Sequence, residues 1–238
     1  MSEKKTILIT GSTSGIGLET AKFLYEVGYE LVLTGRNEEK LKTISNLLGD
    51  APYIVSDLED TDRIKEIFDY CIQNKIKLDG MLHAAGYVIN VPIKLYGLEH
   101  MEKQMRVHYY AFLELCRCFY NRKISNNGAS IVAISSLASV TKMKGSVLYA
   151  GSKSALNTAI SVAAKEFIKR DIRVNGLMPA YVDTRMTDGL GELIDIKEKQ
   201  PMGMIPPANI AKVAEFLLSD SAKYITGALI PISAGMEY

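Results

Sequence analysis

The sequence has few of the residues that build metal sites and disulfide frameworks. Its 238 residues include only three cysteines, Cys71, Cys116 and Cys118, and only three histidines. No cysteine pair has the C-x-x-C spacing of a zinc or redox motif, and an odd number of thiols cannot all pair within one chain. We therefore expect no metal site and no disulfide framework, but three free thiols in a reducing cytosol.

Excess charge and long apolar stretches are also missing. The 28 Lys and Arg residues nearly balance the 27 Asp and Glu residues, and no basic stripe of the kind that binds nucleic acid stands out. No apolar run approaches the roughly 18 residues of a membrane span, and the first residues, MSEKKTILITG, lack the features of a signal peptide. These absences predict a cytoplasmic protein that binds neither nucleic acid nor membranes.

Short apolar runs alternate with longer helical patterns along the whole chain. The runs are continuous rather than alternating, which is typical of parallel strands with helices on both faces. Repeated strand-then-helix order predicts an α/β fold, a doubly wound parallel seven-stranded sheet (Rossmann fold) in a single domain, 1–238. Residues 181–209 show the least pattern and are expected to form a substrate lid within it. The expected strands are 6–10, 30–34, 52–55, 78–84, 130–135, 173–178 and 229–232, and the expected helices are 15–27, 38–48, 61–74, 98–123 and 148–169.

A glycine-rich turn, TGSTSGIG at 10–17, joins the first expected strand to the first expected helix. Glycines permit a tight turn and let the backbone approach a pyrophosphate, while the helix N-terminus offers free N–H groups and the positive end of its dipole. An ordinary loop can share this composition, but a strand before and a helix after are the context that a dinucleotide-binding motif requires. The sequence therefore predicts a phosphate-binding turn.

The TGxxxGIG spacing resembles that of the short-chain dehydrogenase/reductase family, and matches continue over nearly the whole chain. They include Ala84-Ala85-Gly86 where the family usually has Asn-Ala-Gly, and Tyr149-x-x-x-Lys153. The resemblance implies an oxidoreductase acting on CH–OH and C=O groups, similar to 3-oxoacyl-carrier-protein reductases. The cofactor-binding residues that it implies are Gly11, Thr13, Ser14, Gly15, Ile16, Gly17, Arg36, Asp57, Leu58, Ala85, Gly86, Tyr149, Lys153, Pro179, Val182 and Thr184.

Tyr149 and Lys153 lie one helical turn apart, so both side chains can face one site. Carbonyl reduction leaves an alkoxide that needs a proton, and a tyrosine supplies one most readily if a nearby ammonium lowers its pKa from about 10. Such a pair is common on helix surfaces, but its combination with the glycine turn indicates catalysis. In the family, a serine at the position of Ser136 binds the substrate oxygen, and the lysine also contacts the nicotinamide ribose. Ser135 is the adjacent alternative.

One candidate catalytic residue departs from the family pattern. Val107-His108 stands where the family has Val-Asn, and that asparagine anchors a water that relays protons to the lysine. An imidazole donates and accepts hydrogen bonds and titrates near neutrality. His108 can therefore hold or replace that water; the alternative is a helix histidine with no catalytic role.

The loop after the second expected strand indicates which nicotinamide cofactor is used. A site that prefers NAD places a carboxylate there, about 20 residues after the glycine turn, to bind the ribose 2′-hydroxyl. Here Gly35 occupies that position and Arg36 follows. A guanidinium can form a charge-assisted pair with a 2′-phosphate; the alternative is a solvated loop arginine. The sequence predicts NADP(H).

These features together predict an NADP(H)-dependent reductase that converts a ketone to an alcohol. Sugar, steroid or secondary-metabolite ketones are alternative substrates to 3-oxoacyl groups, and a non-catalytic NADP-binding or redox-sensing module is the alternative of another class. The substrate pocket is expected within 87–95, 137–147 and 181–206. The resemblance also implies a homodimer or homotetramer formed through 98–123 and 148–169. The expected outer face of the second of these helices carries Ala155, Ala159, Ala163 and Ala164.

Overall fold

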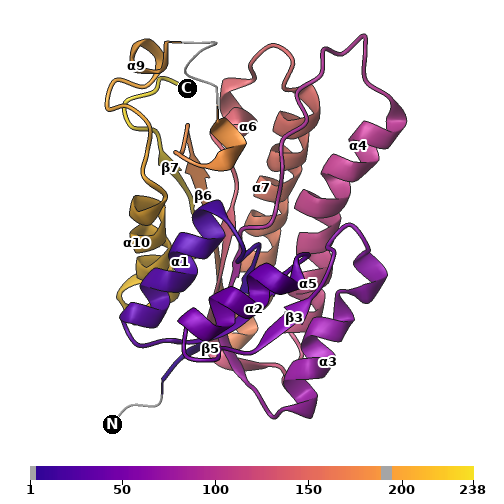
Figure 1. Ribbon diagram of the computed structural model, residues 1–238, viewed down its shortest axis with the longest axis vertical. Helices are drawn as coiled ribbons and strands as arrows, with labels where there is room; N and C mark the ends of the chain where they lie inside the picture. Colours follow the sequence, from indigo (N-terminus) through magenta and orange to yellow (C-terminus); the bar gives the residue numbers. More distant parts are fainter. Residues whose placement is uncertain (1–3, 189–194) are drawn as a thin grey trace.

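The apolar runs of the sequence form a parallel sheet that is covered by helices on both faces. The structure, a computed structural model, describes residues 4–188 and 195–238. Its sheet has seven parallel strands in the order β3-β2-β1-β4-β5-β6-β7, which confirms the predicted doubly wound fold (Figure 1). The strands are β1 (Thr6–Thr10), β2 (Glu30–Gly35), β3 (Tyr53–Val55), β4 (Leu78–His83), β5 (Ser125–Ile134), β6 (Arg173–Pro179) and β7 (Leu229–Ile232).

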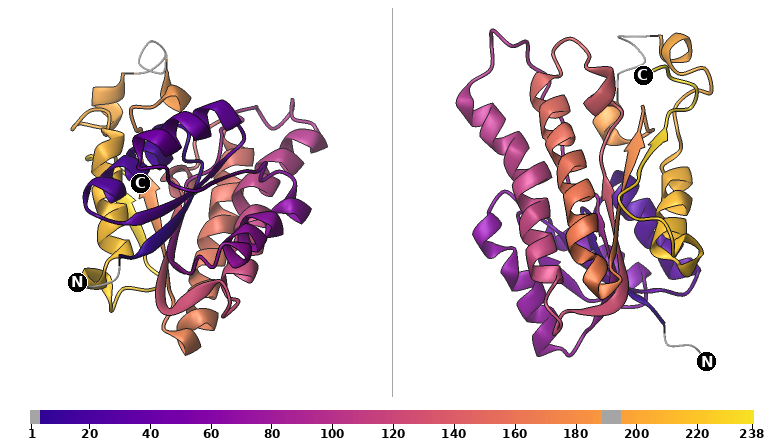
Figure 2. Two further views of the ribbon diagram at one scale, coloured as in Figure 1. Left: turned by 60° about the horizontal axis from the view of Figure 1, so that its bottom comes forward. Right: turned by 180° about the vertical axis from the view of Figure 1, so that it is seen from behind.

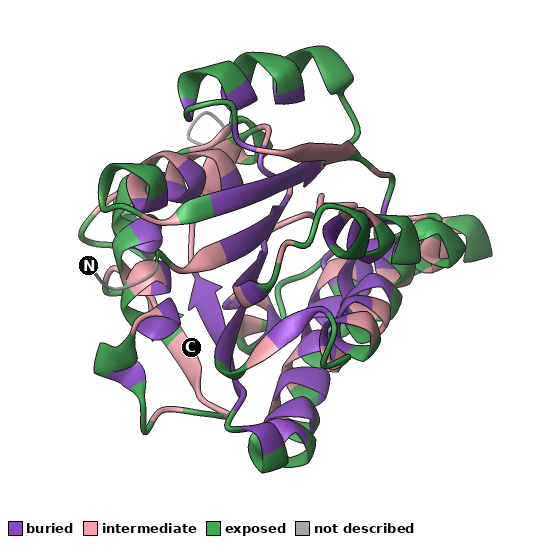
Figure 3. Ribbon diagram, turned by 90° about the horizontal axis from the view of Figure 1, so that it is seen from below, coloured by how far each residue is buried: buried purple, intermediate pink, exposed green. Residues whose placement is uncertain are grey.

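Two apolar cores lie on opposite faces of the sheet. Successive side chains of a strand point to opposite faces, so Ile7 and Ile9 of β1 belong to one core and Leu8 to the other. The first core lies under α1 (Gly15–Glu26), α2 (Glu38–Leu47) and α10 (Pro207–Leu218), and the second under α3 (Lys65–Gln73), α5 (Ala111–Phe119) and α7 (Val147–Phe167). Figure 3 shows buried strands between helices whose outer sides are exposed.

The long helix expected at 98–123 is interrupted by a wider turn. It consists of α4 (Leu98–Met105), a π-helical turn η2 (Arg106–Tyr110) and α5. The right panel of Figure 2 shows this column beside α7. A π-helical turn inserts an extra residue into the helix and is frequent at functional sites. Here it carries His108, so the residue that departs from the family pattern lies on an irregular part of its helix.

The remaining elements differ from the sequence-based expectation mainly at their ends. The helix expected at 61–74 divides into a 3₁₀ turn η1 (Thr61–Arg63) and α3, and α7 continues into η3 (Ile168–Arg170). Helix α10 was not expected, although Pro207 at its first turn and buried Ile210, Ala214 and Leu217 are signals for it. The other short elements are α6 (Ala138–Thr141), η4 (Arg185–Thr187), α9 (Ile196–Lys199) and η5 (Asp220–Ala222).

Part of the expected lid at 181–209 lies outside the described residues, namely 189–194. The two sides of its described part are joined by a parallel bridge between Val182 and Ile205. Gln200 is fully buried there, and its side-chain amide accepts from the Tyr181 N–H at 2.9 Å and donates to the Tyr181 carbonyl at 3.0 Å.

The expected alanine face of α7 is wrong. Ala159, Ala163 and Ala164 are buried in the core under α7, because small side chains let this helix pack closely against the sheet. The exposed apolar side chains of this part of the molecule are instead Val147 and Val162 on α7 and Leu98, Met101, Tyr110 and Leu113 on the α4–α5 column. No helix in residues 4–188 and 195–238 is both long enough and apolar enough to cross a membrane.

Candidate active site

A cavity of about 620 Å³ runs along the carboxyl ends of the strands. It lies where the strand order reverses between β1 and β4, the place where open α/β sheets bind their ligands. Its wall includes every site residue expected from the sequence apart from Gly17. Residues that are more than 100 positions apart in the chain, such as Gly11 and Tyr149, are thereby brought to one site.

The glycine turn has the geometry of an anion cradle. Gly11 has φ of 68°, and a Cβ there would lie 2.7 Å from the backbone nitrogen of Ala85. Both the backbone N–H and the hydroxyl of Ser12 donate to the carbonyl of Thr34, at 3.2 Å and 3.1 Å. The first turn of α1 carries no acidic residue, and its N-cap Ser14 makes no side-chain cap bond. The N–H groups at this helix end therefore suit a phosphate.

Gly17 supports the turn from beneath instead of lining the cavity. A Cβ on Gly17 would collide with the carbonyl oxygen of Gly11. The helix and the turn can approach each other this closely only because Gly17 has no side chain.

The catalytic candidates gather at the other end of the cavity. Ser136 follows β5, and its hydroxyl accepts from the Ala138 N–H at 3.1 Å. Ser135 is buried, and its hydroxyl donates to the side chain of Asn157 on α7. Burial raises the pKa of the Tyr149 phenol, and of these two serines it is Ser136 whose hydroxyl opposes this rise. The geometry therefore favours Ser136 over Ser135 as the partner of the tyrosine.

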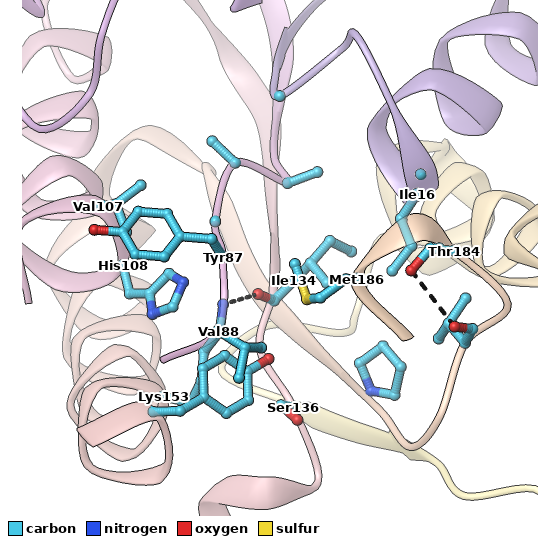
Figure 4. Close-up of a pocket in the computed structure, with 18 of the residues that line it drawn as sticks. Ile16, Tyr87, Val88, Val107, His108, Ile134, Ser136, Lys153, Thr184 and Met186 are labelled. Carbon is cyan, nitrogen blue, oxygen red and sulfur yellow. Dashed lines mark hydrogen bonds between the residues drawn. The ribbon is translucent and has the colours of Figure 1, made fainter. Parts of the chain in front are cut away.

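Lys153 makes its hydrogen bond to a backbone carbonyl of β5. Its side chain is 4% exposed, and Nζ donates to the Ile134 carbonyl at 2.8 Å (Figure 4). Burial lowers the pKa of Lys153 to about 7. Burial also raises the pKa of Tyr149, against the opposing effect of Ser136. The expected lowering of the Tyr149 pKa by Lys153 is therefore wrong for this structure, in which Nζ lies 5.8 Å from the tyrosine ring centroid.

His108 reaches the same region from η2, where it is fully buried. Its Nδ1 lies 2.8 Å from the Ser152 hydroxyl, which itself donates to the Tyr149 carbonyl at 2.8 Å. A hydroxyl has one proton to donate. Because Ser152 gives that proton to the carbonyl, Nδ1 of His108 must carry a proton and donate it to Ser152. The bare nitrogen of the ring is then Nε2, an acceptor.

The environment of Nε2 keeps His108 neutral. Within residues 4–188 and 195–238, this buried atom has no hydrogen-bond partner, and a Cβ on Gly86 would lie 2.6 Å from it. Burial, followed by the charge of Lys153, lowers the pKa of His108 well below 6.5. The ring also packs edge-on against Tyr149, with centroids 5.5 Å apart. The expected titration of His108 near neutrality is therefore wrong.

Charged side chains dominate the end of the cavity near β2 and β3. Arg36 follows β2 and is 62% exposed, with Nη1 lying 3.8 Å from Oε1 of Glu59. A Cβ on Gly35 would lie 3.0 Å from Cγ2 of Thr13. A carboxylate-bearing residue at position 35 would therefore crowd the glycine turn. Asp57 also lines this end, and Leu58 lies beside it.

Several residues at the site were not singled out from the sequence. Ser152 and Glu59 do not line the cavity but contact the wall residues His108 and Arg36. Ser152 could have been found as a hydroxyl directly before Lys153, and Glu59 as the second acid after β3. Met236 comes from the end of the chain and lines the cavity although nothing in the pattern around it points there. Within the expected substrate segments, the cavity wall includes Val88, Asn90, Thr141, Met143, Ser146, Tyr181, Arg185, Met186 and Thr187.

Comparison with known proteins decides the family. A family model described as Enoyl-(Acyl carrier protein) reductase matches residues 11–237. The chain belongs to the short-chain dehydrogenase/reductase family. As a member of this family, it is an oxidoreductase, and the resemblance stated from its motifs is confirmed.

Relatives and solved structures extend this likeness over nearly the full length. The chain is 31% identical over 236 residues to the 3-oxoacyl-[acyl-carrier-protein] reductase of Rickettsia felis, covering 98% of this chain and 96% of the relative. It is 30% identical to a 2,5-dichloro-2,5-cyclohexadiene-1,4-diol dehydrogenase of Sphingobium indicum, with 97% and 95% covered. A short-chain type dehydrogenase/reductase from Mycobacterium ulcerans superposes with a TM-score of 0.90 at 26% identity, covering 99% of this chain and 90% of the other.

Proposed function

We propose that this family member is an NADP(H)-dependent reductase that transfers a hydride between the nicotinamide and a ketone or secondary alcohol, in the manner of a 3-oxoacyl reductase. One observation carries the proposal. A single cavity joins a phosphate cradle at the glycine turn to Ser136, Tyr149 and Lys153. A cavity with one cofactor-sized arm and one cluster of proton-carrying groups suits hydride transfer coupled to protonation.

The chain's own residues supply binding and proton transfer. The cofactor, when bound, supplies the hydride. The Ser136 hydroxyl binds the carbonyl oxygen of the substrate, and Tyr149 protonates that oxygen as charge develops on it. The raised pKa of Tyr149 keeps its proton in place at neutral pH, as a proton donor requires. Lys153, with a pKa of about 7, exchanges protons near neutrality and is the residue that would hold the nicotinamide ribose.

His108 takes the place of the family's relay asparagine in this proposal. Its neutral ring donates through Nδ1 to Ser152, which leaves Nε2 as a buried acceptor facing Gly86. An acceptor there can hold a water on the proton path to Lys153 without changing its own charge. His108 therefore acts as a fixed hydrogen-bonding group, which is the role of an asparagine, and not as a titrating acid.

Arg36 is the basis for proposing NADP(H) as the cofactor. It lines the arm of the cavity beyond the glycine turn, and Gly35 leaves no carboxylate at the position that would repel a 2′-phosphate. The guanidinium is more than half exposed, and it can present its donor fork to phosphate oxygens.

An acyl chain is the substrate group best suited to the mouth of the cavity. Met143, Met186 and Met236 line it, and methionine side chains adapt to flexible apolar ligands. Lys142, Lys144 and Arg185 are exposed near this mouth and suit an acidic carrier. Relatives named as 3-oxoacyl-[acyl-carrier-protein] reductases support this choice. Sugar, steroid and secondary-metabolite ketones remain alternatives, and the diol dehydrogenase relative acts on a ring alcohol.

Assembly and location complete the proposal. The exposed apolar side chains of the α4–α5 column and α7, such as Leu113 and Val162, suit a homodimer or homotetramer. The expected cytoplasmic location suits an enzyme that depends on a soluble cofactor and carries free thiols.

A substrate screen tests the reaction. The purified chain is mixed with NADPH and a panel of 3-oxoacyl thioesters, keto sugars, ketosteroids and simple ketones, and cofactor oxidation is followed by absorbance. We expect turnover to be fastest on a 3-oxoacyl thioester. If turnover is faster on another class of ketone, the assignment of a 3-oxoacyl substrate is wrong and that class is the substrate. Cofactor binding without oxidation by any member of the panel would favour the non-catalytic module.

A further inference from the structure

Glu59 is a carboxylate that the loop after β3 holds beside Arg36, just outside the lining of the cofactor arm of the cavity. The Glu59 N–H donates to Oδ1 of Asp57 at 3.0 Å, and the Asp60 N–H donates to the Asp57 carbonyl at 3.1 Å. These two bonds fix the backbone on both sides of the Glu59 Cα. The side chain is 28% exposed, and Oε1 lies 3.8 Å from Nη1 of Arg36. The position of Glu59 is therefore built into the loop and does not depend on the Arg36 contact alone.

The charge of Glu59 also acts on Tyr87. This tyrosine follows the turn after β4, and its ring lines the cavity beside Val107 and His108 (Figure 4). Its hydroxyl is buried, with no hydrogen-bond partner in the described part of the chain. Burial, followed by the negative charge of Glu59, raises the pKa of Tyr87 to about 12. The Glu59 carboxylate thus lies beside Arg36 in the loop after β2, and its charge also acts on Tyr87 in the loop after β4.

We propose that Glu59 is a specificity-determining residue that limits the preference for NADP(H) and lets the site accept NAD(H) as well. This inference rests on the proposed use of Arg36 to bind a 2′-phosphate. A carboxylate beside Arg36 competes for the guanidinium and repels the incoming dianion. The same carboxylate can accept a hydrogen bond from a 2′-hydroxyl, which is the contact that an NAD-preferring site makes.

The geometry explains why the acid comes from this loop. Position 35, where an NAD-preferring site has its carboxylate, is occupied by Gly35, and a Cβ there would lie 3.0 Å from Cγ2 of Thr13. Glu59 brings a carboxylate to the same corner from the neighbouring strand. Arg36 and Glu59 therefore place opposite charges at the point where the two cofactors differ, and cofactor preference follows from their balance.

Binding titrations test the role of Glu59 without relying on turnover. Dissociation constants for NADPH and NADH are measured by cofactor fluorescence for the wild type, Glu59→Gln, Arg36→Ala and Asp62→Asn. Asp62 is an exposed acid three positions further along, so Asp62→Asn makes the same change of charge away from Arg36. Thermal unfolding of each variant confirms that it folds.

We expect Glu59→Gln to tighten NADPH binding by about three- to tenfold, the scale of one partly exposed charge pair. NADH binding should stay the same or weaken. The gain should shrink as salt rises from about 0.05 M to about 0.5 M, because the charges are partly exposed to solvent. Asp62→Asn should change the NADPH-to-NADH ratio much less than Glu59→Gln does.

Two results separate this inference from the proposed function. If Arg36→Ala lowers the NADPH-to-NADH ratio while Glu59→Gln leaves it unchanged, the Glu59 inference is wrong and the NADP(H) assignment stands. If Arg36→Ala leaves the ratio unchanged, the cofactor assignment itself is wrong and the inference falls with it. If Glu59→Gln and Asp62→Asn tighten NADPH binding equally, the effect comes from the overall surface charge and not from the position of Glu59. That result would also overturn the inference.

Discussion

The two ends of the cavity differ in what determines their electrostatics, which is burial at one end and exposed charge at the other. At the catalytic end, Lys153 and His108 are buried, and loss of hydration shifts their pKa values downward. At the cofactor end, Arg36 and Glu59 are partly exposed and act through charge. Burial sets protonation states that change little with salt, whereas exposed charges give recognition that salt and single substitutions readily alter. Changes at the buried end should therefore act on chemistry, and changes at the exposed end on cofactor choice.

The largest effect should come from removing the phenol at the buried end. Tyr149→Phe keeps the ring and its packing but removes the group that protonates the substrate. We expect kcat to fall by about 10²–10⁴-fold, while the NADPH dissociation constant changes little. Steady-state kinetics and cofactor titration measure the two quantities separately. A variant that keeps most of its turnover would show that another group donates the proton.

A smaller effect should follow from His108→Leu, since His108 supports the reaction through hydrogen bonds. We expect about a ten- to 100-fold loss of kcat, at the lower end of proton-transfer contributions. His108→Asn, which retains a donor and an acceptor, should recover much of it. Wild type and His108→Asn should show the same pH profile, because His108 is already neutral at working pH.

Two outcomes would contradict this role. Equal turnover of the wild type and His108→Leu would leave His108 as a packing residue. A titration near pH 6.5 that is present in the wild type and lost in His108→Asn would show that the buried ring does ionise.

The smallest expected effect is on the pH dependence of the free energy of unfolding. It measures how far burial lowers the pKa of Lys153. The unfolded chain keeps the lysine proton up to about pH 10.4, whereas the folded chain releases it near 7. Between these values the unfolded state binds more protons, so the free energy of unfolding rises with pH. From pH 7 to pH 8.5, Lys153 should contribute a rise of about 1–2 kcal/mol.

Lys153→Met should lose this rise. Urea unfolding of both proteins at the two pH values, without cofactor, gives the difference. Identical pH dependence in the wild type and Lys153→Met would mean that the buried amine keeps an ordinary pKa.

The same contrast explains how far the sequence could predict the site. Gly11, Ser136 and Tyr149 follow strands or begin helices, and the strand pattern alone determines that such positions meet at one edge of a parallel sheet. The fold class and the set of cavity residues were therefore predictable. The protonation states of Tyr149 and His108 were not, because they depend on burial that arises only when distant segments pack together.

Contacts between loops could not be predicted from sequence patterns either. The approach of Glu59 to Arg36 depends on how the loops after β2 and β3 sit side by side. The burial of the α7 alanines depends on which side of the helix meets the sheet. Neither is encoded in local spacing.

The tight contact between Gly86 and the His108 ring also constrains how this enzyme can change over time. A methyl group at position 86 would lie 2.6 Å from Nε2 of His108, too close for both side chains to coexist in their present places. A side chain at position 86 would therefore require the His108 ring to move from its place against Tyr149. The identity of residue 86 and the placement of His108 are thus coupled, and a substitution at either position should be compensated at the other.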